Sequence, residues 1–313
     1  MDALTDLLDG VRARGALFGQ AVLEPPWALR FATGAPLTLT TMLRGEAWVV
    51  AADAAPVRIG AGDLAIVAGA APHVVADDPA TPPGHEVSTP DYCRRADGTE
   101  ARIALDVRTC GERADGSALL LSAAYDRAGG ISERLLRWLP PVLVLRAGEC
   151  PDPGPALLAD QVDRDLPGQQ VVLDRVLDLV LVSALRSWFD RAGTRPPWYR
   201  GAGDPVVDEA LRLLHADPAR PWTVAALAGA TGVSRAALAR RFAERVGTPP
   251  MTYLGDWRIA LAADLLRESD DTVDAVARKV GYADVFSLST AFKRRRGTTP
   301  TQHRASARDP LVR

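Results

Sequence analysis

Cationic side chains gather on two short stretches near the C-terminal end of the chain. The first stretch holds Arg235, Arg240 and Arg241, and the second holds Lys293 followed by three arginines. A guanidinium can donate two hydrogen bonds to the O6 and N7 atoms of guanine, and both cations bind phosphate oxygens. These residues therefore predict recognition of nucleic acid. For the second stretch the alternative is a solvated helix end, because positive charge also suits a helix C-terminus.

A different set of reactive side chains lies in the N-terminal half, where His73, Cys93 and Cys110 supply one imidazole and two thiols. Together they could bind zinc or copper(I), with His85 as a further ligand, or the thiols could respond to oxidants. The alternative is a buried histidine with two inert core thiols, because no Cys-x-x-Cys spacing is present. Three cysteines in a chain of 313 residues form no disulfide framework, so we expect reduced thiols.

Residue patterns typical of catalysis are missing from the sequence. Residues 37–43, the candidate early strand of a metal-binding barrel, contain no histidine, which argues against an oxygenase-type iron centre. We find no Ser/His/Asp order, glycine-rich phosphate loop or His-Glu-x-x-His motif. We expect a protein that is not an enzyme. A barrel enzyme fused to DNA-binding helices is the alternative, and it would need a three-ligand metal centre.

Charge is divided unequally along the chain, whose net charge is −2. Residues 204–313 hold 17 basic and 13 acidic side chains, whereas residues 1–203 hold 20 and 26. This asymmetry favours an anionic partner for the C-terminal part only. No run of eighteen apolar residues occurs, and the first fifteen residues lack the apolar core of a signal peptide. We therefore expect a cytoplasmic protein without a membrane partner.

Short β-segments separated by turn residues fill residues 16–125, after a small leading helix at residues 4–14. Such spacing is typical of an antiparallel sandwich or barrel. The expected strands are residues 37–43, 47–51, 64–67, 74–76, 103–107 and 118–124. Helical periodicity begins near residue 132, and Pro167 with Gly168 splits residues 156–191 into two helices. The second of these is apolar on more than one face, which predicts either a helix–helix dimer contact or packing against the barrel.

Residues 223–250 and 272–300 repeat the same pattern about fifty positions apart. In each copy a threonine can cap a first helix, a glycine ends it, and Ser234 or Asp284 can cap a second helix. Two short helices joined in this way form a helix-turn-helix motif, whose second helix can lie in the major groove of DNA. Residues 251–268 between the copies predict one helix of roughly 27 Å. This length approaches the roughly 34 Å between successive major-groove turns on one face of DNA.

The repeated motif resembles that of the AraC/XylS family of transcription regulators. Residues 205–304 are similar to the DNA-binding domain of that family, and residues 275–282 and 289–300 carry its second motif. In the first copy the matching residues are Thr223, Gly232, Val233, Ser234, Phe242, Gly247 and Pro250. The family's closing segment usually has an aromatic residue before its final arginine, and this chain has His303 there, which we expect to be a packing residue.

The N-terminal part resembles the cupin-like sensor domain that often precedes these helices. Residues 60–67 with Pro72 and His73 fit a cupin motif, although Ala68 and Ala70 replace its usual proline and glycine. Cys110 with Gly111 and residues 135–141 also resemble that sensor group. The resemblance implies an α+β multidomain protein in which an antiparallel cupin-like barrel with a helical appendage precedes an all-α domain with two helix-turn-helix motifs. We delimit a sensor domain (1–150), a helical dimerisation or packing segment (151–195), a linker (196–204) and a DNA-binding domain (205–313).

The outward faces of the two second helices give the candidate contacts with double-stranded DNA. They are Ser234, Arg235, Ala236, Ala239, Arg240, Arg241, Val285, Phe286, Ser289, Thr290, Lys293, Arg294 and Arg296. Several relatives carry glutamate at position 285 and arginine at position 290. Because this chain has Val285 and Thr290, we expect less hydrogen bonding and more contact with methyl groups there.

The resulting hypothesis is a sequence-specific transcription regulator controlled by a signal in the β-domain. The resemblance implies activation and contact with RNA polymerase, and the apolar faces of the second helix within residues 156–191 favour a homodimer. The effector is a small molecule, a metal or an oxidant, and a thiol- or metal-responsive redox sensor is the alternative within this class.

Overall fold

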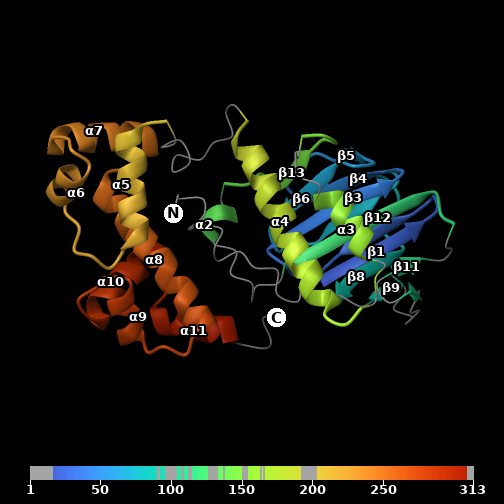
Figure 1. Cartoon of the computed structure of the whole chain (residues 1–313). Helices are drawn as coiled ribbons and strands as arrows, with labels where there is room; N and C mark the ends of the chain where they lie inside the picture. The colour runs from blue at the N-terminus through green and yellow to red at the C-terminus, as the bar shows by residue number, and fades with distance from the viewer. Residues whose placement is uncertain are drawn as a thin grey trace. The chain divides into compact units, whose positions relative to one another are not determined.

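The computed structural model describes two compact parts of the chain, which divide after Arg191 and are treated separately below (Figure 1). The described residues are 17–89, 92–95, 104–106, 109–111, 115–125, 133–136, 138–149, 154–162, 164, 166–191 and 203–308. The expected leading helix at residues 4–14 and most of the expected linker lie outside this set. None of the described helices is long and apolar enough to cross a lipid bilayer.

Two β-sheets form the first part, which we call the β-domain. The larger sheet has the strand order β10-β11-β1-β12-β3-β6-β13, and the smaller has the order β5-β4-β7-β2-β8-β9. The strands are β1 (Leu17–Leu23), β2 (Ala28–Phe31), β3 (Leu37–Arg44), β4 (Glu46–Ala51), β5 (Val57–Gly60), β6 (Leu64–Ala68), β7 (His73–Ala76), β8 (His85–Thr89), β9 (Tyr92–Arg95), β10 (Ala104–Asp106), β11 (Thr109–Gly111), β12 (Ala118–Tyr125) and β13 (Val142–Leu145).

A single apolar core joins the two sheets. Leu29, Phe31 and Val75 of the smaller sheet pack with Met42 and Leu120 of the larger sheet. This arrangement confirms the predicted cupin-type barrel, because the inward residues of both sheets share one interior. The sheets are mixed rather than purely antiparallel, since β1 pairs in parallel with β11 and β2 pairs in parallel with β8.

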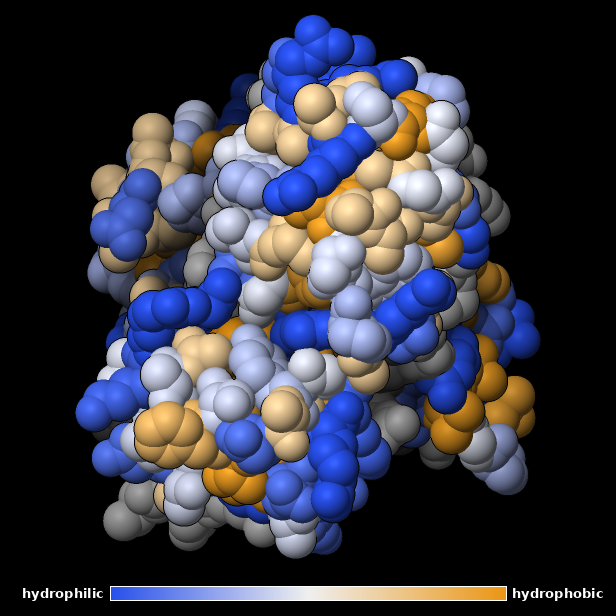
Figure 2. Space-filling view, turned by 90° about the vertical axis from the view of Figure 1, so that its left-hand side faces the viewer, coloured by the Kyte–Doolittle hydropathy of each residue, from blue (hydrophilic) through white to orange (hydrophobic). Residues whose placement is uncertain are grey.

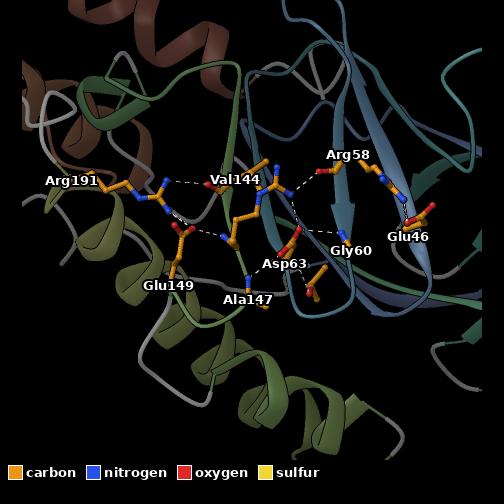
Figure 3. A network of polar contacts seen from close by, with 10 residues as sticks. Glu46, Arg58, Gly60, Asp63, Val144, Ala147, Glu149 and Arg191 are labelled. Atoms are coloured by element: carbon orange, nitrogen blue, oxygen red, sulfur yellow. Dashed lines mark hydrogen bonds and ion pairs between the residues drawn. The ribbon is translucent and has the colours of Figure 1, made fainter.

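The turn between β5 and β6 is fixed by the buried carboxylate of Asp63 (Figure 3). This carboxylate accepts hydrogen bonds from the backbone N–H of Gly60 (3.0 Å) and Ala147 (2.9 Å), and pairs with Arg146 Nη1 at 2.7 Å. Burial alone would raise the pKa of Asp63, but these donors outweigh it and hold the pKa below 3.8. Asp63 thus ties the turn to the segment that follows β13.

Helices cover part of the barrel and confirm the predicted break at Pro167 and Gly168. They are α3 (Gly154–Val162) and α4 (Gln169–Phe189), whereas the short helix α2 (Glu133–Leu136) precedes β13. The Tyr125 hydroxyl of β12 donates a hydrogen bond of 2.8 Å to the carbonyl of Leu177, which anchors α4. One face of α4 is buried in the β-domain, while Val171, Val172 and Leu179 on α4 are exposed.

The second part, which we call the helical domain, contains the two predicted helix-turn-helix motifs. Its helices are α5 (Pro205–Ala216), α6 (Val224–Ala230), α7 (Arg235–Val246), α8 (Pro250–Glu268), α9 (Val273–Lys279), α10 (Val285–Arg296) and α11 (Pro300–Arg308). Figure 1 shows α6 with α7 at one end of this domain and α9 with α10 at the other. The first motif is α6–α7, the second is α9–α10, and α8 joins them.

Replacing Asp63 by alanine should lower the free energy of unfolding of the β-domain by about 1–3 kcal/mol, because buried amides would lose their acceptor. Thermal unfolding of the full chain would measure this change. Since the pKa of Asp63 is lowered, its stabilisation is present above pH 3.8 and is lost as the pH falls through the folded pKa. The difference between wild type and variant should therefore shrink at acidic pH.

The matched control is Glu46→Ala in the same network, where Glu46 pairs with Arg58 and both side chains are more than half exposed. Exposed pairs contribute roughly 0–1 kcal/mol, so this variant should unfold close to wild type. Equal shifts for the two variants would contradict the role given to Asp63.

Candidate nucleic-acid interface

Local hydrogen bonds begin each helix of the two motifs, as the sequence predicts. Thr223 and Thr272 accept from the backbone N–H groups of Ala226 (3.0 Å) and Ala275 (3.1 Å). Ser234 accepts from Ala237 N at 3.2 Å, and Asp284 accepts from Ser287 N at 2.7 Å. Each motif turns at a glycine with positive φ, which is 71° at Gly232 and 83° at Gly281. The tight turn brings α7 and α10 back onto the helix before them.

The outer face of α7 carries the residues that the sequence predicts to meet DNA. Leu238 and Phe242 are buried, and the Phe242 ring meets the Tyr253 ring edge-on at 5.7 Å. The opposite face consequently points outward, with Ser234, Arg235, Ala236 and Arg240 exposed and Ala239 half-buried. This face offers two guanidinium groups to a groove.

Arg241 is held inside the helical domain by an ion pair that the sequence did not reveal. Its Nε and Nη2 atoms donate to the two carboxylate oxygens of Asp204 at 2.9 and 2.7 Å. The same carboxylate caps α5 by accepting from Val206 N and Val207 N. Burial would raise the pKa of Asp204, but the Arg241 guanidinium and the two amides hold it below 3.8. Arg241 thereby joins α7 to the start of α5.

The outer face of α10 has a different chemical character from that of α7. Leu288 and Phe292 fill the core beside α8, while Val285, Phe286 and Thr290 are exposed. Ser289 on the same face is half-buried. The surface on which the two motifs lie faces the viewer in Figure 2, where hydrophobic side chains appear among hydrophilic ones.

In the basic run at the end of α10, two side chains are exposed and two make contacts within the helical domain. Lys293 and Arg294 are exposed. Arg295 Nε donates to the Asp256 carboxylate of α8 at 2.6 Å, and the Arg296 guanidinium lies 5.8 Å from the centre of the Phe292 ring. Phosphate contact is therefore most accessible to Lys293 and Arg294.

The two motifs are braced against each other by Arg258 of α8. Its Nε donates to the carbonyl of Pro218 (2.7 Å) and its Nη2 donates to the carbonyl of Arg220 (2.8 Å), both before α6. The guanidinium also lies 6.0 Å from the Tyr282 ring in the turn of the second motif. A Cβ atom at Gly281 would lie 2.7 Å from Cα of Ala219, so only glycine fits there.

The last helix closes this domain and places His303 as a packing residue. The His303 ring lies 5.4 Å from the Phe292 ring. Arg304 Nε donates to the carbonyl of Leu266 at 3.2 Å, and its Nη2 donates to the carbonyl of Asp271. These bonds tie α11 to the end of α8.

The candidate metal ligands of the β-domain lie on three different strands, His73 on β7, Cys93 on β9 and Cys110 on β11. Cys110 is disulfide-bonded, so the expectation of a reduced thiol is wrong for this residue, and its sulfur is not free to act as a thiolate ligand. Within the described part of the chain, no three histidine, cysteine, aspartate or glutamate side chains lie together as a metal site. The Cys93 side chain is outside the described residues.

His73 itself is a core residue of the β-domain. It is 5% exposed and stacks on Phe31 with a ring separation of 5.1 Å. Burial lowers the pKa of His73 from 6.5 to about 4, so the imidazole is neutral at physiological pH. His85, the further candidate ligand, lines a separate pocket of about 160 Å³ with Glu24 and Trp27.

Comparisons with known proteins agree with both parts of this description. A cupin family model matches residues 2–190, and a helix-turn-helix domain model matches residues 227–306. The chain is 32% identical to a putative AraC-like transcription regulator of Streptomyces antibioticus over 97% of this chain and 98% of that protein. It is 24% identical to the transcriptional regulator AlkR of Acinetobacter baylyi over 97% and 99% of the two chains.

Among solved structures, the DNA-binding domain of the global transcriptional factor AdpA, in complex with a target DNA, is similar to part of the chain. The identity is 31%, the match covers 34% of this chain and 96% of that one, and the TM-score is 0.32. The curated relatives over nearly the full length are named as transcription regulators, not as enzymes. With its cupin domain followed by two helix-turn-helix motifs, the chain belongs to the AraC/XylS family of DNA-binding transcription regulators.

Proposed function

We propose that this regulator activates transcription by placing α7 and α10 in two successive major-groove segments on one face of double-stranded DNA. The observation that carries the proposal is the repeated motif, in which each second helix turns an exposed face outward from a buried Leu and Phe pair. The connecting helix α8 has 19 residues and is therefore about 28 Å long. That length is suited to groove segments about 34 Å apart, because side chains extend beyond the helix axis.

Within this interface the exposed cations have separate roles. Arg240 reads a guanine, because its guanidinium lies on the outward face of α7 one turn from the helix start. Arg235, Lys293 and Arg294 bind phosphates and set the position of the protein on the duplex. Arg241 supports α7 through Asp204 and contributes to DNA binding by positioning that helix.

Control by a signal is assigned to the β-domain, and contact with RNA polymerase follows from the family. The pocket beside Trp27 is smaller than the roughly 300–1,000 Å³ of typical ligand sites, so it has room for a small effector only. Glu24 and His85 would present a carboxylate and an imidazole to such a molecule.

The exposed face of α4 is proposed as the homodimer contact. Val171, Val172 and Leu179 are 59%, 42% and 44% exposed. On the same face Arg175 Nη1 lies 3.3 Å from the Asp178 carboxylate. If two copies of α4 pack antiparallel about a two-fold axis, Arg175 of each copy faces Asp178 of the other, so the surface is complementary to itself.

Footprinting of the full chain on DNA fragments selected for binding tests the central claim. Hydroxyl-radical cleavage should show two protected segments about one helical turn apart on the same face of the duplex. Transcription in vitro from a promoter beside that site should rise when the protein is added. A single protected segment would overturn the two-groove model, and a fall in transcription would overturn activation.

The Arg240→Ala variant should bind its selected site about 1–3 kcal/mol more weakly and lose preference for the base that Arg240 contacts. Titrations on the selected site, on base-substituted sites and on random DNA would measure both effects. The control is Arg245→Ala, which removes the same charge from the last turn of the same helix, outside the candidate contacts. Equal loss on specific and random DNA would show that Arg240 contacts only phosphate.

The Leu179→Glu variant should convert a dimer into a monomer, because it places a carboxylate within the apolar contact. Sedimentation velocity of the full chain would measure the change. Ala156→Glu on the exposed side of α3 adds the same charge outside the proposed contact and should leave the dimer intact. A monomeric wild-type protein, or a dimeric Leu179→Glu variant, would refute this contact.

A further inference from the structure

The two second helices differ at the positions where each presents its outward face. The repeat offset of fifty aligns Arg235 with Val285 and Arg240 with Thr290. It also aligns Ala236 with the much larger Phe286. At both outward positions where α7 has an arginine, 235 and 240, α10 therefore has a methyl-bearing side chain. The two motifs share a backbone design but cannot share a mode of base reading.

We propose that α10 recognises thymine through the C5-methyl group, with Phe286 and Val285 as the contacting side chains and Thr290 beside them. The inference rests on the function proposed above and specifies the bases that the two helices would contact. The operator has a guanine-containing segment under α7 and a thymine-containing segment under α10.

The first support is the exposure of an aromatic ring that the fold does not need. Phe286 is 80% exposed and Val285 is 38% exposed, whereas Leu288 and Phe292 of the same helix are fully buried. The core of the second motif is thus complete without Phe286. A large apolar side chain at the start of a helix that enters the major groove is placed where base edges are contacted.

The second support is the charge at the start of α10. The Asp284 carboxylate caps the helix by accepting from Ser287 N, and this bond holds the pKa of Asp284 below 3.8. An ionised carboxylate there disfavours a phosphate at the helix start. The exposed cations of α10 lie two turns further on, at Lys293 and Arg294. Phosphates are therefore bound at the far end, and the apolar start is left for base edges.

The third support is the chemistry of the groove itself. In the major groove, guanine, cytosine and adenine present hydrogen-bonding groups, and thymine adds a methyl group to its acceptor. Val285 and Phe286 have no side-chain donor or acceptor and so cannot form hydrogen bonds with the other edges. Burial of one methyl against them contributes about 0.8 kcal/mol, which corresponds to about a fourfold change in affinity.

Replacement of single thymines by deoxyuridine in the selected site provides the test, because it removes only the methyl group and keeps the base pair. Affinity of the full chain should fall about fourfold for each contacted thymine, and the sensitive positions should cluster in one of the two footprint segments. The other segment should contain the bases that Arg240 contacts. Substitution of those bases should weaken DNA binding by the wild type but not by the Arg240→Ala variant. Deoxyuridine outside these segments is the DNA control.

The Phe286→Ala variant tests whether the phenyl ring makes the contact with the methyl group. It should bind thymine and deoxyuridine sites equally, whereas the conservative Phe286→Leu variant should keep part of the difference. Because Phe286 is largely exposed, neither change should alter the thermal unfolding of the chain. The matched control is Thr298→Ala, an exposed residue just after α10 and outside the candidate contacts, which should keep the full thymine preference.

Three results would overturn the inference. Wild-type protein that binds thymine and deoxyuridine sites equally would do so directly. A Phe286→Ala variant with normal DNA affinity but reduced transcription would reassign the ring to a contact with polymerase. Absence of any sequence-specific site would contradict both this inference and the proposed function. A two-segment footprint that depends on Arg240 but is insensitive to deoxyuridine would contradict this inference alone.

Discussion

A fixed spacing between α7 and α10 depends on the contacts made by one guanidinium, that of Arg258. It bonds two carbonyls that precede the first motif and approaches the tyrosine ring in the turn of the second. Gly281 lets that turn approach the backbone of Ala219 more closely than any side chain would permit. Because α8 also packs on Phe242 of the first motif and on the core of the second, the Arg258 contacts add a polar link to an apolar connection.

Two copies of one structural design have diverged in their surface chemistry while keeping their cores. Leu238 with Phe242, and Leu288 with Phe292, occupy equivalent buried positions. Arginine side chains on one outward face and apolar side chains on the other give the two motifs different preferences. If the two motifs read DNA as proposed above, the binding site is asymmetric, and its direction relative to a promoter is defined even for a single chain.

Local chemistry explains what the sequence could predict. The hydroxyl and carboxylate caps, the positive-φ glycines and the split at Pro167 and Gly168 depend on neighbouring residues and were predicted correctly. The buried positions of α8 follow no simple pattern in the sequence, because Ala260, Leu261 and Leu265 are half-buried, whereas Ile259, Ala262 and Leu266 are buried. This helix packs against both motifs in turn, so its buried positions do not follow a single face.

Long-range contacts account for most of the remaining differences. The partner of Arg241 is 37 positions away at Asp204, and no spacing rule connects the two. Short strands such as β5 and β13 are recognisable only from their pairing with distant strands. The disulfide of Cys110 was likewise missed, because three cysteines in a long chain carry no framework pattern.

The carboxylate of Asp204 links the first residues of the helical domain to two of its helices, α5 and α7. It lies next to Gly203, where the described chain enters α5, and it holds the α5 backbone and the Arg241 side chain at once. A force applied to the chain at Gly203 is transmitted to α7 through the ion pair between Asp204 and Arg241. A displacement of the chain at Gly203 would thus act on α7, the helix that carries the exposed Arg235 and Arg240.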